Sequence, residues 1–190
     1  MEHNYFQHAK HDEFIGSLLT GAIAGATAIW VMDRLDWFTY DHQDPEARRQ
    51  TDAVRPEGLD PAHVIANTLA HALDTKLGSH RPHEHPAGLA VHYALGIVPA
   101  ALYGAFRSRM SMLSAGQGSL FGLGLFVIQD EGLNSLLGVA ADPRRYPWQA
   151  HARGLIAHLL FGLTVNTALN LMKLENSDRT NRIEQEKENS

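Results

Sequence analysis

The chain is predicted to be an all-α membrane protein, a four-transmembrane-helix bundle, because its charged residues are strongly segregated along the sequence. Four runs lack Asp, Glu, Lys and Arg altogether: residues 14–32, 86–106, 110–129 and 154–172. Each run approaches the roughly 20 apolar residues that a helix needs to cross a bilayer. The mean hydropathy of -0.23 would suit a soluble domain, but it averages these runs with polar connections. A soluble bundle would instead place polar residues every few positions on its outer faces.

The first span is expected at about residues 14–37, where aromatic residues resemble an interfacial belt. These residues are Trp30, Trp37, Phe38 and Tyr40. The connection of residues 41–85 is polar and is the largest extramembrane feature. Within it, residues 60–77 have an N-cap candidate in Asp60 and helical apolar spacing. We expect a short amphipathic helix there, ended by Gly78, lying against the bundle or in the headgroup layer, with partner binding as the alternative.

The second and third spans, at about residues 86–106 and 110–138, are joined by only three residues and should form an antiparallel hairpin. The fourth span is expected at about residues 151–173. All four belong to one predicted domain, residues 1–174, and the charged tail of residues 175–190 is expected to be disordered. The leader before the first run is acidic as well as basic, which disfavours a removed signal peptide.

Small residues recur four positions apart within the spans. The pairs are Gly21 and Gly25, Ala100 and Gly104, and Gly118 and Gly122. Such pairs let helix backbones approach closely in lipid, so a tight bundle is expected rather than a wide pore. A small-residue stripe left uncovered would permit a homo-oligomer or a membrane-protein partner, and the sequence leaves this open.

Several function classes are disfavoured. A net charge of -5 and a pI near 6.2 provide no basic surface for nucleic acid. The absence of cysteine excludes disulfides and thiolate metal sites. The glycine run of residues 116–122 lies in an apolar span with no preceding strand, so it does not predict a nucleotide site. No catalytic motif is present, which favours a non-enzymatic protein.

The candidate functional residues are ionisable side chains at membrane depth, where their cost makes a functional role the default hypothesis. They are His92, Asp130, Glu131 and His158, with Asp33 as an outlier and His151 near a span end. His92 and His158 share helix faces with small residues and should point into the bundle. Four interpretations stay open: interhelical hydrogen bonds that fix the packing, a divalent metal site, a haem b held by two imidazoles, and a proton relay.

A second histidine cluster lies outside the spans, in the first connection. Its members are His80, His83 and His85, which form a weak candidate metal site with a solvated loop as the favoured interpretation. It should lie on the opposite face of the membrane from His3, His8 and His11, so these two groups cannot cooperate.

The spans resemble those of the YagU-like group of small bacterial inner-membrane proteins. The similarity is carried by the sequence of residues 121–131, by Leu137-Gly138, Tyr146-Pro147 and residues 157–162, and by His92, residues 101–104, residues 21–25 and Met32-Asp33. The resemblance implies a helical bundle in the inner membrane and supplies no catalytic residue. A link to acid tolerance has been suggested within the group, and a His and carboxylate cluster is compatible with it. The chain departs from the group in its histidine-rich first connection.

These observations predict a non-enzymatic protein of the bacterial inner membrane, either an accessory or stress-related component or a small transporter of protons or divalent metal. The alternative is a membrane-bound metal- or haem-dependent redox protein. Basic residues are nearly balanced between the two sides, and the short Arg107–Arg109 connection favours cytoplasmic termini.

Overall fold

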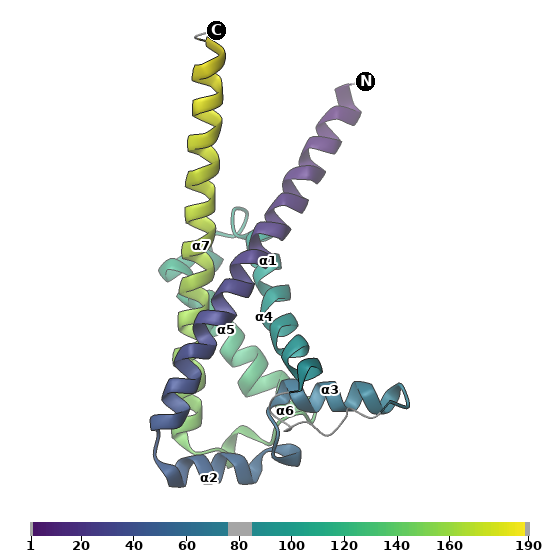
Figure 1. Cartoon of the computed structure of the whole chain (residues 1–190), viewed down its shortest axis with the longest axis vertical. Coiled ribbons are helices and arrows are strands. Elements are labelled where there is room, and N and C mark those ends of the chain that lie inside the picture. The colour runs from purple at the N-terminus through teal and green to yellow at the C-terminus, as the bar shows by residue number, and fades with distance from the viewer. Residues whose placement is uncertain (1, 76–84, 189–190) are drawn as a thin grey trace.

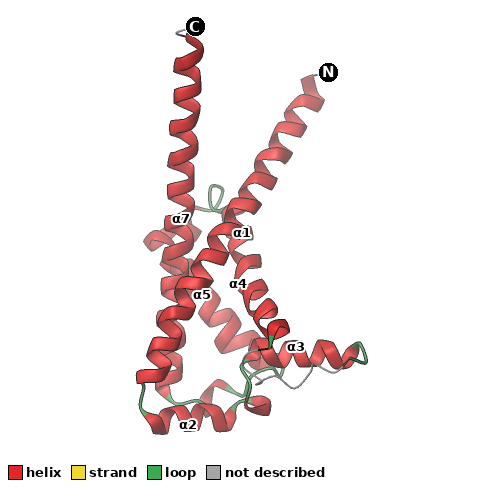
Figure 2. Cartoon of the chain, in the orientation of Figure 1, coloured by secondary structure: helices red, strands yellow, loops and turns green. Residues whose placement is uncertain are grey.

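The computed structural model describes residues 2–75 and 85–188, and these residues form helices and connections with no strand among them (Figure 2). The α-helices are α1 (Glu2–His42), α2 (Pro45–Val54), α3 (Pro61–Ala72), α4 (Pro86–Phe106), α5 (Ser119–Leu125), α6 (Asn134–Leu136) and α7 (Trp148–Glu188). Tighter or wider helical segments are η1 (Pro56–Gly58), η3 (Ser111–Gly118), the π-helical η4 (Phe126–Leu133) and η5 (Pro143–Arg145). The predicted all-α class is confirmed for the described residues.

Among the described residues, three helices are long and apolar enough to cross a membrane. They are His11–His42 of α1, Pro86–Phe106 of α4 and Trp148–Glu175 of α7. Large apolar side chains are exposed on their outer faces, for example Leu19 and Ile23 on α1, Val98 on α4, and Ile156 and Leu171 on α7. A soluble monomer rarely exposes this much contiguous apolar surface, whereas lipid covers it at no cost. Three of the four predicted spans therefore form helices with the length and apolar composition that a membrane crossing needs.

The segment predicted as the third span, residues 110–138, is not one regular helix. Gly116, Gln117 and Gly118 all have positive φ, at 59°, 58° and 92°, and a right-handed helix cannot continue through them. Regular helix therefore begins at Ser119 rather than at residue 110. From there α5, η4 and α6 follow one another without a loop, with a π-helical middle.

Close backbone contacts join the helices at the predicted small residues. Gly21 of α1 faces the Ala100 region of α4, where an added Cβ would lie 2.6 Å from the Ala100 carbonyl oxygen. A Cβ added at Gly104 would lie 2.6 Å from the Ser17 carbonyl oxygen, so α1 and α4 run antiparallel. On the other side of the bundle, Gly122 of α5 abuts the backbone of α7. The predicted role of these residues in tight packing is confirmed.

The first connection contains two helices that lie across one end of the long helices, opposite the chain termini (Figure 1). The carboxylate of Asp44 caps α2 by accepting the backbone N–H groups of Glu46 and Ala47. Asp60 caps α3 in the same way through the N–H of His63. The α2 helix was not predicted. The α3 helix lies in the predicted place but ends at Ala72, and its predicted terminator, Gly78, lies outside the described residues.

The end of the chain differs from the expectation of a disordered tail, because α7 continues through this stretch to Glu188. Glu, Gln, Lys and Arg, which dominate there, have high helix propensity and no breaker interrupts them. Both α1 and α7 extend beyond the bundle at the end that carries the termini (Figure 1).

Candidate functional site

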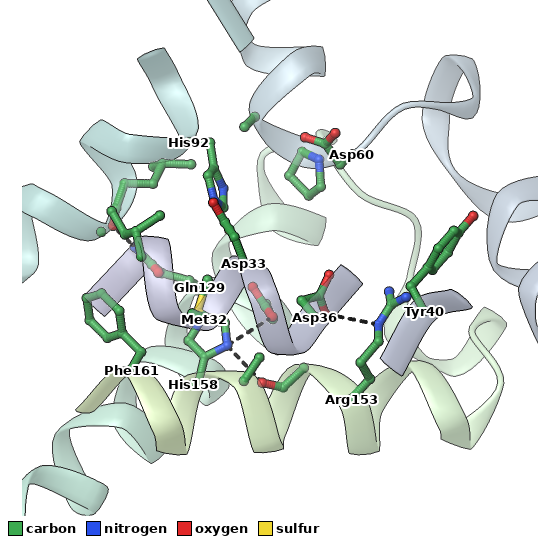
Figure 3. Close-up of a pocket in the computed structure, with 18 of the residues that line it drawn as sticks. Met32, Asp33, Asp36, Tyr40, Asp60, His92, Gln129, Arg153, His158 and Phe161 are labelled. Carbon is green, nitrogen blue, oxygen red and sulfur yellow. Dashed lines mark hydrogen bonds and ion pairs between the residues drawn. The ribbon is translucent and has the colours of Figure 1, made fainter. Parts of the chain in front are cut away.

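A cavity of about 590 Å³ lies at the end of the bundle that α2 and α3 cover. Its walls come from α1, α3, α4, α5, η4 and α7, so most of the fold contributes to it. The predicted residues Asp33, His92 and His158 line it (Figure 3), and so does Asp130. Four positions that are far apart in the sequence are thus brought to one site.

Asp33 and His92 form a close pair between α1 and α4 in this cavity. The Nε2 of His92 lies 2.8 Å from Oδ1 of Asp33, and the two side chains are only 32% and 17% exposed. The antiparallel packing of α1 and α4 causes this pairing, because it puts the end of one helix beside the beginning of the other. Asp33, expected to be an outlier, is therefore the direct partner of His92.

His158 is oriented by its own helix. Its Nδ1 lies 2.9 Å from the carbonyl oxygen of Gly154, and donation to that oxygen requires the proton to be on Nδ1. Oδ2 of Asp130 is 3.6 Å from the same nitrogen, which is ion-pair distance but too long for a hydrogen bond. Asp130 itself lies in η4, and π-helical turns of this kind occur frequently at functional sites.

Glu131 does not join this group. Its Oε1 lies 2.6 Å from Nδ1 of His151, and both residues line a second cavity of about 140 Å³. Nε2 of His151 also lies 3.0 Å from the carbonyl oxygen of Pro143. The single cluster of His92, Asp130, Glu131 and His158 expected from the sequence is therefore divided into separate histidine–carboxylate pairs. Asp130 lines both cavities, whereas Glu131 lines the smaller one and not the larger one.

Asp36 and Arg153 are site residues that the sequence reasoning missed. Nε of Arg153 lies 3.2 Å from Oδ1 of Asp36, and the guanidinium lies 4.9 Å from the centre of the Tyr40 ring (Figure 3). Its Nε and Nη1 are buried without a hydrogen-bond partner among the described residues. The sequence could have indicated Arg153, because it is the only Lys or Arg between Arg145 and Lys173.

Asp60 and His63, at the start of α3, were also missed as site residues. Nδ1 of His63 lies 2.7 Å from Oδ2 of Asp60, and the imidazole packs against Gly88 of α4. Burial raises the pKa of Asp60, but hydrogen bonds from His63 and the positive charges of His63 and Arg55 outweigh it and hold the pKa below its usual value of 3.8. The capping pattern at Asp60 predicted that a helix begins here. That the first turn of this helix lines the cavity follows only from the packing of α3 on α4.

The geometry provides little for the metal hypotheses. Within residues 2–75 and 85–188, no three His, Cys, Asp or Glu side chains are grouped so that they could hold a metal ion. In the loop candidate, Nδ1 of His85 accepts the N–H of Ala87 at 3.1 Å and so caps α4. His80 and His83 lie outside the described residues.

Comparison with protein-family models, with curated proteins and with solved structures finds no match to this chain. The resemblance to the YagU-like group therefore stays a prediction from the sequence.

Proposed function

We propose that the chain crosses the membrane four times, with α5, η4 and α6 as a further crossing beside α1, α4 and α7. The contacts of α4 with α7 support this, because Tyr103 and Arg107 bind Asn166 and Arg107 also binds Asn170, so these helices run parallel. Two parallel crossings require the chain between them to return through the bilayer. The returning helix of about 18 residues is ~27 Å long at 1.5 Å per residue, near the ~30 Å hydrocarbon core.

The proposed location is the bacterial inner membrane, with both termini in the cytoplasm. The resemblance to the YagU-like group supports the membrane, and Arg107 and Arg109 support the orientation because they follow α4 at the end that carries the termini. Alkaline phosphatase fused after Ser190 should be inactive, and green fluorescent protein at the same position should be fluorescent. The reverse result would contradict this orientation.

The proposed activity is proton handling of the small-transport type, carried out by the histidine–carboxylate pairs around the larger cavity. The observation that carries it is the convergence of Asp33, His92, Asp130 and His158 from α1, α4, η4 and α7 on one cavity. An imidazole beside a carboxylate can take up and release a proton near neutral pH, and ionisable pairs within spans mark proton pathways in membrane proteins.

Proton handling is favoured over metal binding because the described residues provide histidine–carboxylate pairs rather than a group of three possible metal ligands. A proton needs only a donor and an acceptor at hydrogen-bond distance, which these pairs supply.

Purified protein reconstituted into liposomes tests the proposal. Vesicles containing pyranine are given a pH gradient, with potassium and valinomycin clamping the membrane potential, and the rate of internal pH change is measured. The wild-type chain should exceed protein-free vesicles, and Asp33→Asn and His158→Ala should each be slower by roughly tenfold or more. The matched control is His71→Ala, because His71 is exposed on α3 and does not line the cavity.

Two results would contradict proton handling by this site. One is a wild-type rate equal to that of empty vesicles. The other is a flux that Asp33→Asn and His158→Ala leave unchanged while both variants remain monodisperse and helical.

A further inference from the structure

The walls of the larger cavity carry more negative than positive charge. Its carboxylates are Asp33, Asp36, Asp41, Asp60 and Asp130, and its guanidinium groups are Arg55 and Arg153. Both guanidinium groups already have acidic partners: Arg153 pairs with Asp36, and Arg55 lies 3.4 Å from Asp52, outside the lining. Of the remaining carboxylates, Asp33 and Asp60 pair with the imidazoles of His92 and His63, and Asp130 lies 3.6 Å from His158 and 3.4 Å from Asn134. The cavity therefore attracts positive charge.

Much of the remaining wall is apolar. Met32, Leu89, Leu95, Leu125 and Phe161 line it, and Trp37 and Tyr40 add aromatic faces. Small-molecule sites typically combine a mainly apolar wall with a few placed polar groups, in cavities of about 300–1,000 Å³. Aromatic faces also attract cations. The wall chemistry thus matches a molecule with an apolar body and a positive charge, and matches a hydrated metal ion poorly.

His63 adds an observation that is independent of the acidic side chains. It lines the cavity, is only 6% exposed, and its Nε2 is buried without a hydrogen-bond partner among the described residues. Because Nδ1 is directed at Asp60, Nε2 is the ring nitrogen without a partner. Buried polar atoms are nearly always paired, so an unpaired ring nitrogen on a residue of the cavity wall is typical of a site that receives a polar partner.

We infer that this cavity binds an organic cation with an apolar body, such as a lipophilic amine or quaternary ammonium compound. The inference rests on the proposed function, for which it names the ligand class: the cation would compete with protons for the same carboxylates. Aromatic and aliphatic groups would pack against Leu89, Leu95 and Phe161, and the positive centre would lie among Asp33, Asp60 and Asp130.

Two ions of nearly equal size and opposite charge provide the test. Tetraphenylphosphonium and tetraphenylborate are titrated separately into the full chain in phosphatidylcholine nanodiscs, with isothermal titration calorimetry and empty nanodiscs as the blank. The phosphonium should bind saturably, and the borate should bind roughly tenfold more weakly or not at all. Equal or tighter binding of the borate would overturn the inference and would identify the unpaired Nη1 of Arg153 as an anion site instead.

Charge-removing variants locate the site. Asp130→Asn should weaken phosphonium binding by roughly tenfold, and Asp41→Asn by several-fold, since Asp41 is exposed at the rim. Asp41→Asn removes no buried contact and therefore keeps the test valid if Asp130→Asn does not fold. Asp74→Asn is the matched control, because Asp74 is exposed outside the cavity and Asn tolerates its φ of 51°. Unchanged binding in both cavity variants would overturn the inference.

The two proposals fail separately, because the proton-flux assay contains no organic cation. Absence of phosphonium binding with a flux that depends on Asp33 and His158 overturns the cation site alone. Charge-selective phosphonium binding without any proton flux supports the cation site and overturns the proposed proton handling.

Discussion

The hydrogen bond between Asp33 and His92 is predicted to couple α1 to α4 by about 1–2 kcal/mol. Hydrogen bonds to a charged partner contribute about 1.5–3 kcal/mol, and the 2.8 Å separation is typical of them. Since 32% of the His92 side chain is exposed, water competes for the pair and the lower part of that range applies. Double-mutant cycles between membrane helices average ~0.6 kcal/mol, with a maximum near 1.7 kcal/mol, which supports the same order.

The assay is a double-mutant cycle of Asp33→Ala and His92→Ala. Free energies of unfolding are obtained for all four proteins in mixed micelles of a mild detergent and dodecyl sulfate, with helicity followed by circular dichroism. A second cycle combines Asp33→Ala with His151→Ala, because His151 pairs with Glu131 instead, and it should be additive within about 0.5 kcal/mol. Coupling between Asp33 and His92 no larger than in this second cycle would refute the pairing.

Three further predictions concern packing, capping and pH. Gly122→Ala places a methyl group against the α7 backbone and should destabilise the fold by about 1–3 kcal/mol. The control is Gly124→Ala, whose added methyl group meets nothing within 4 Å and which should be neutral or stabilising. Thermal melts compare the stabilities of the two variants. Tyr103→Phe removes the 2.8 Å hydrogen bond to Asn166 and should destabilise the fold by about 0.6–1.7 kcal/mol in the same mixed-micelle assay. The reference variant is Phe161→Leu. A smaller loss of stability in Tyr103→Phe than in this reference would show that packing contributes more than the hydrogen bond does. Asp60→Asn keeps a capping oxygen but removes the charge. The pKa of Asp60 is lowered in the fold, despite the burial that raises it, so this variant should lose about 1 kcal/mol of stability at about pH 6. The difference from wild type should decrease below about pH 4 and vanish once the pH has fallen below the lowered pKa, where acid neutralises the wild-type carboxylate. A difference that persists at low pH would contradict the charge explanation.

The sequence predicted the helical class, the three long apolar helices and the residues at which helices approach closely. These features are local: a run without charge and a pair of small residues four positions apart have the same meaning wherever the helix lies. The third predicted span was less accurate, since η3 occupies its first part. Gly116 and Gly118 were interpreted only as packing residues, although glycine also permits the positive φ that ends a helix.

The sequence predicted which residues belong to the site better than it predicted which histidine pairs with which carboxylate. His92, Asp130 and His158 do line one cavity, but Glu131 turns to His151, and Asp33 is a central residue. Asp33 could have been placed from the sequence, because antiparallel neighbours bring the end of the first span to the depth of the start of the second. The different partners of Asp130 and Glu131 could not, because they depend on how η4 is rotated relative to the neighbouring helices.

The amino-acid order alone therefore determined that uncharged helices of membrane length form and that a few ionisable residues interrupt them. The tertiary structure decided which carboxylate meets which imidazole, and that the first turn of α3 joins α1, α4, η4 and α7 around an acidic cavity. The physical reason is that an apolar helix has no polar face to fix its rotation about its own axis. Its rotation is set by where small residues of a neighbouring helix allow contact, and that information is distributed over segments far apart in the chain.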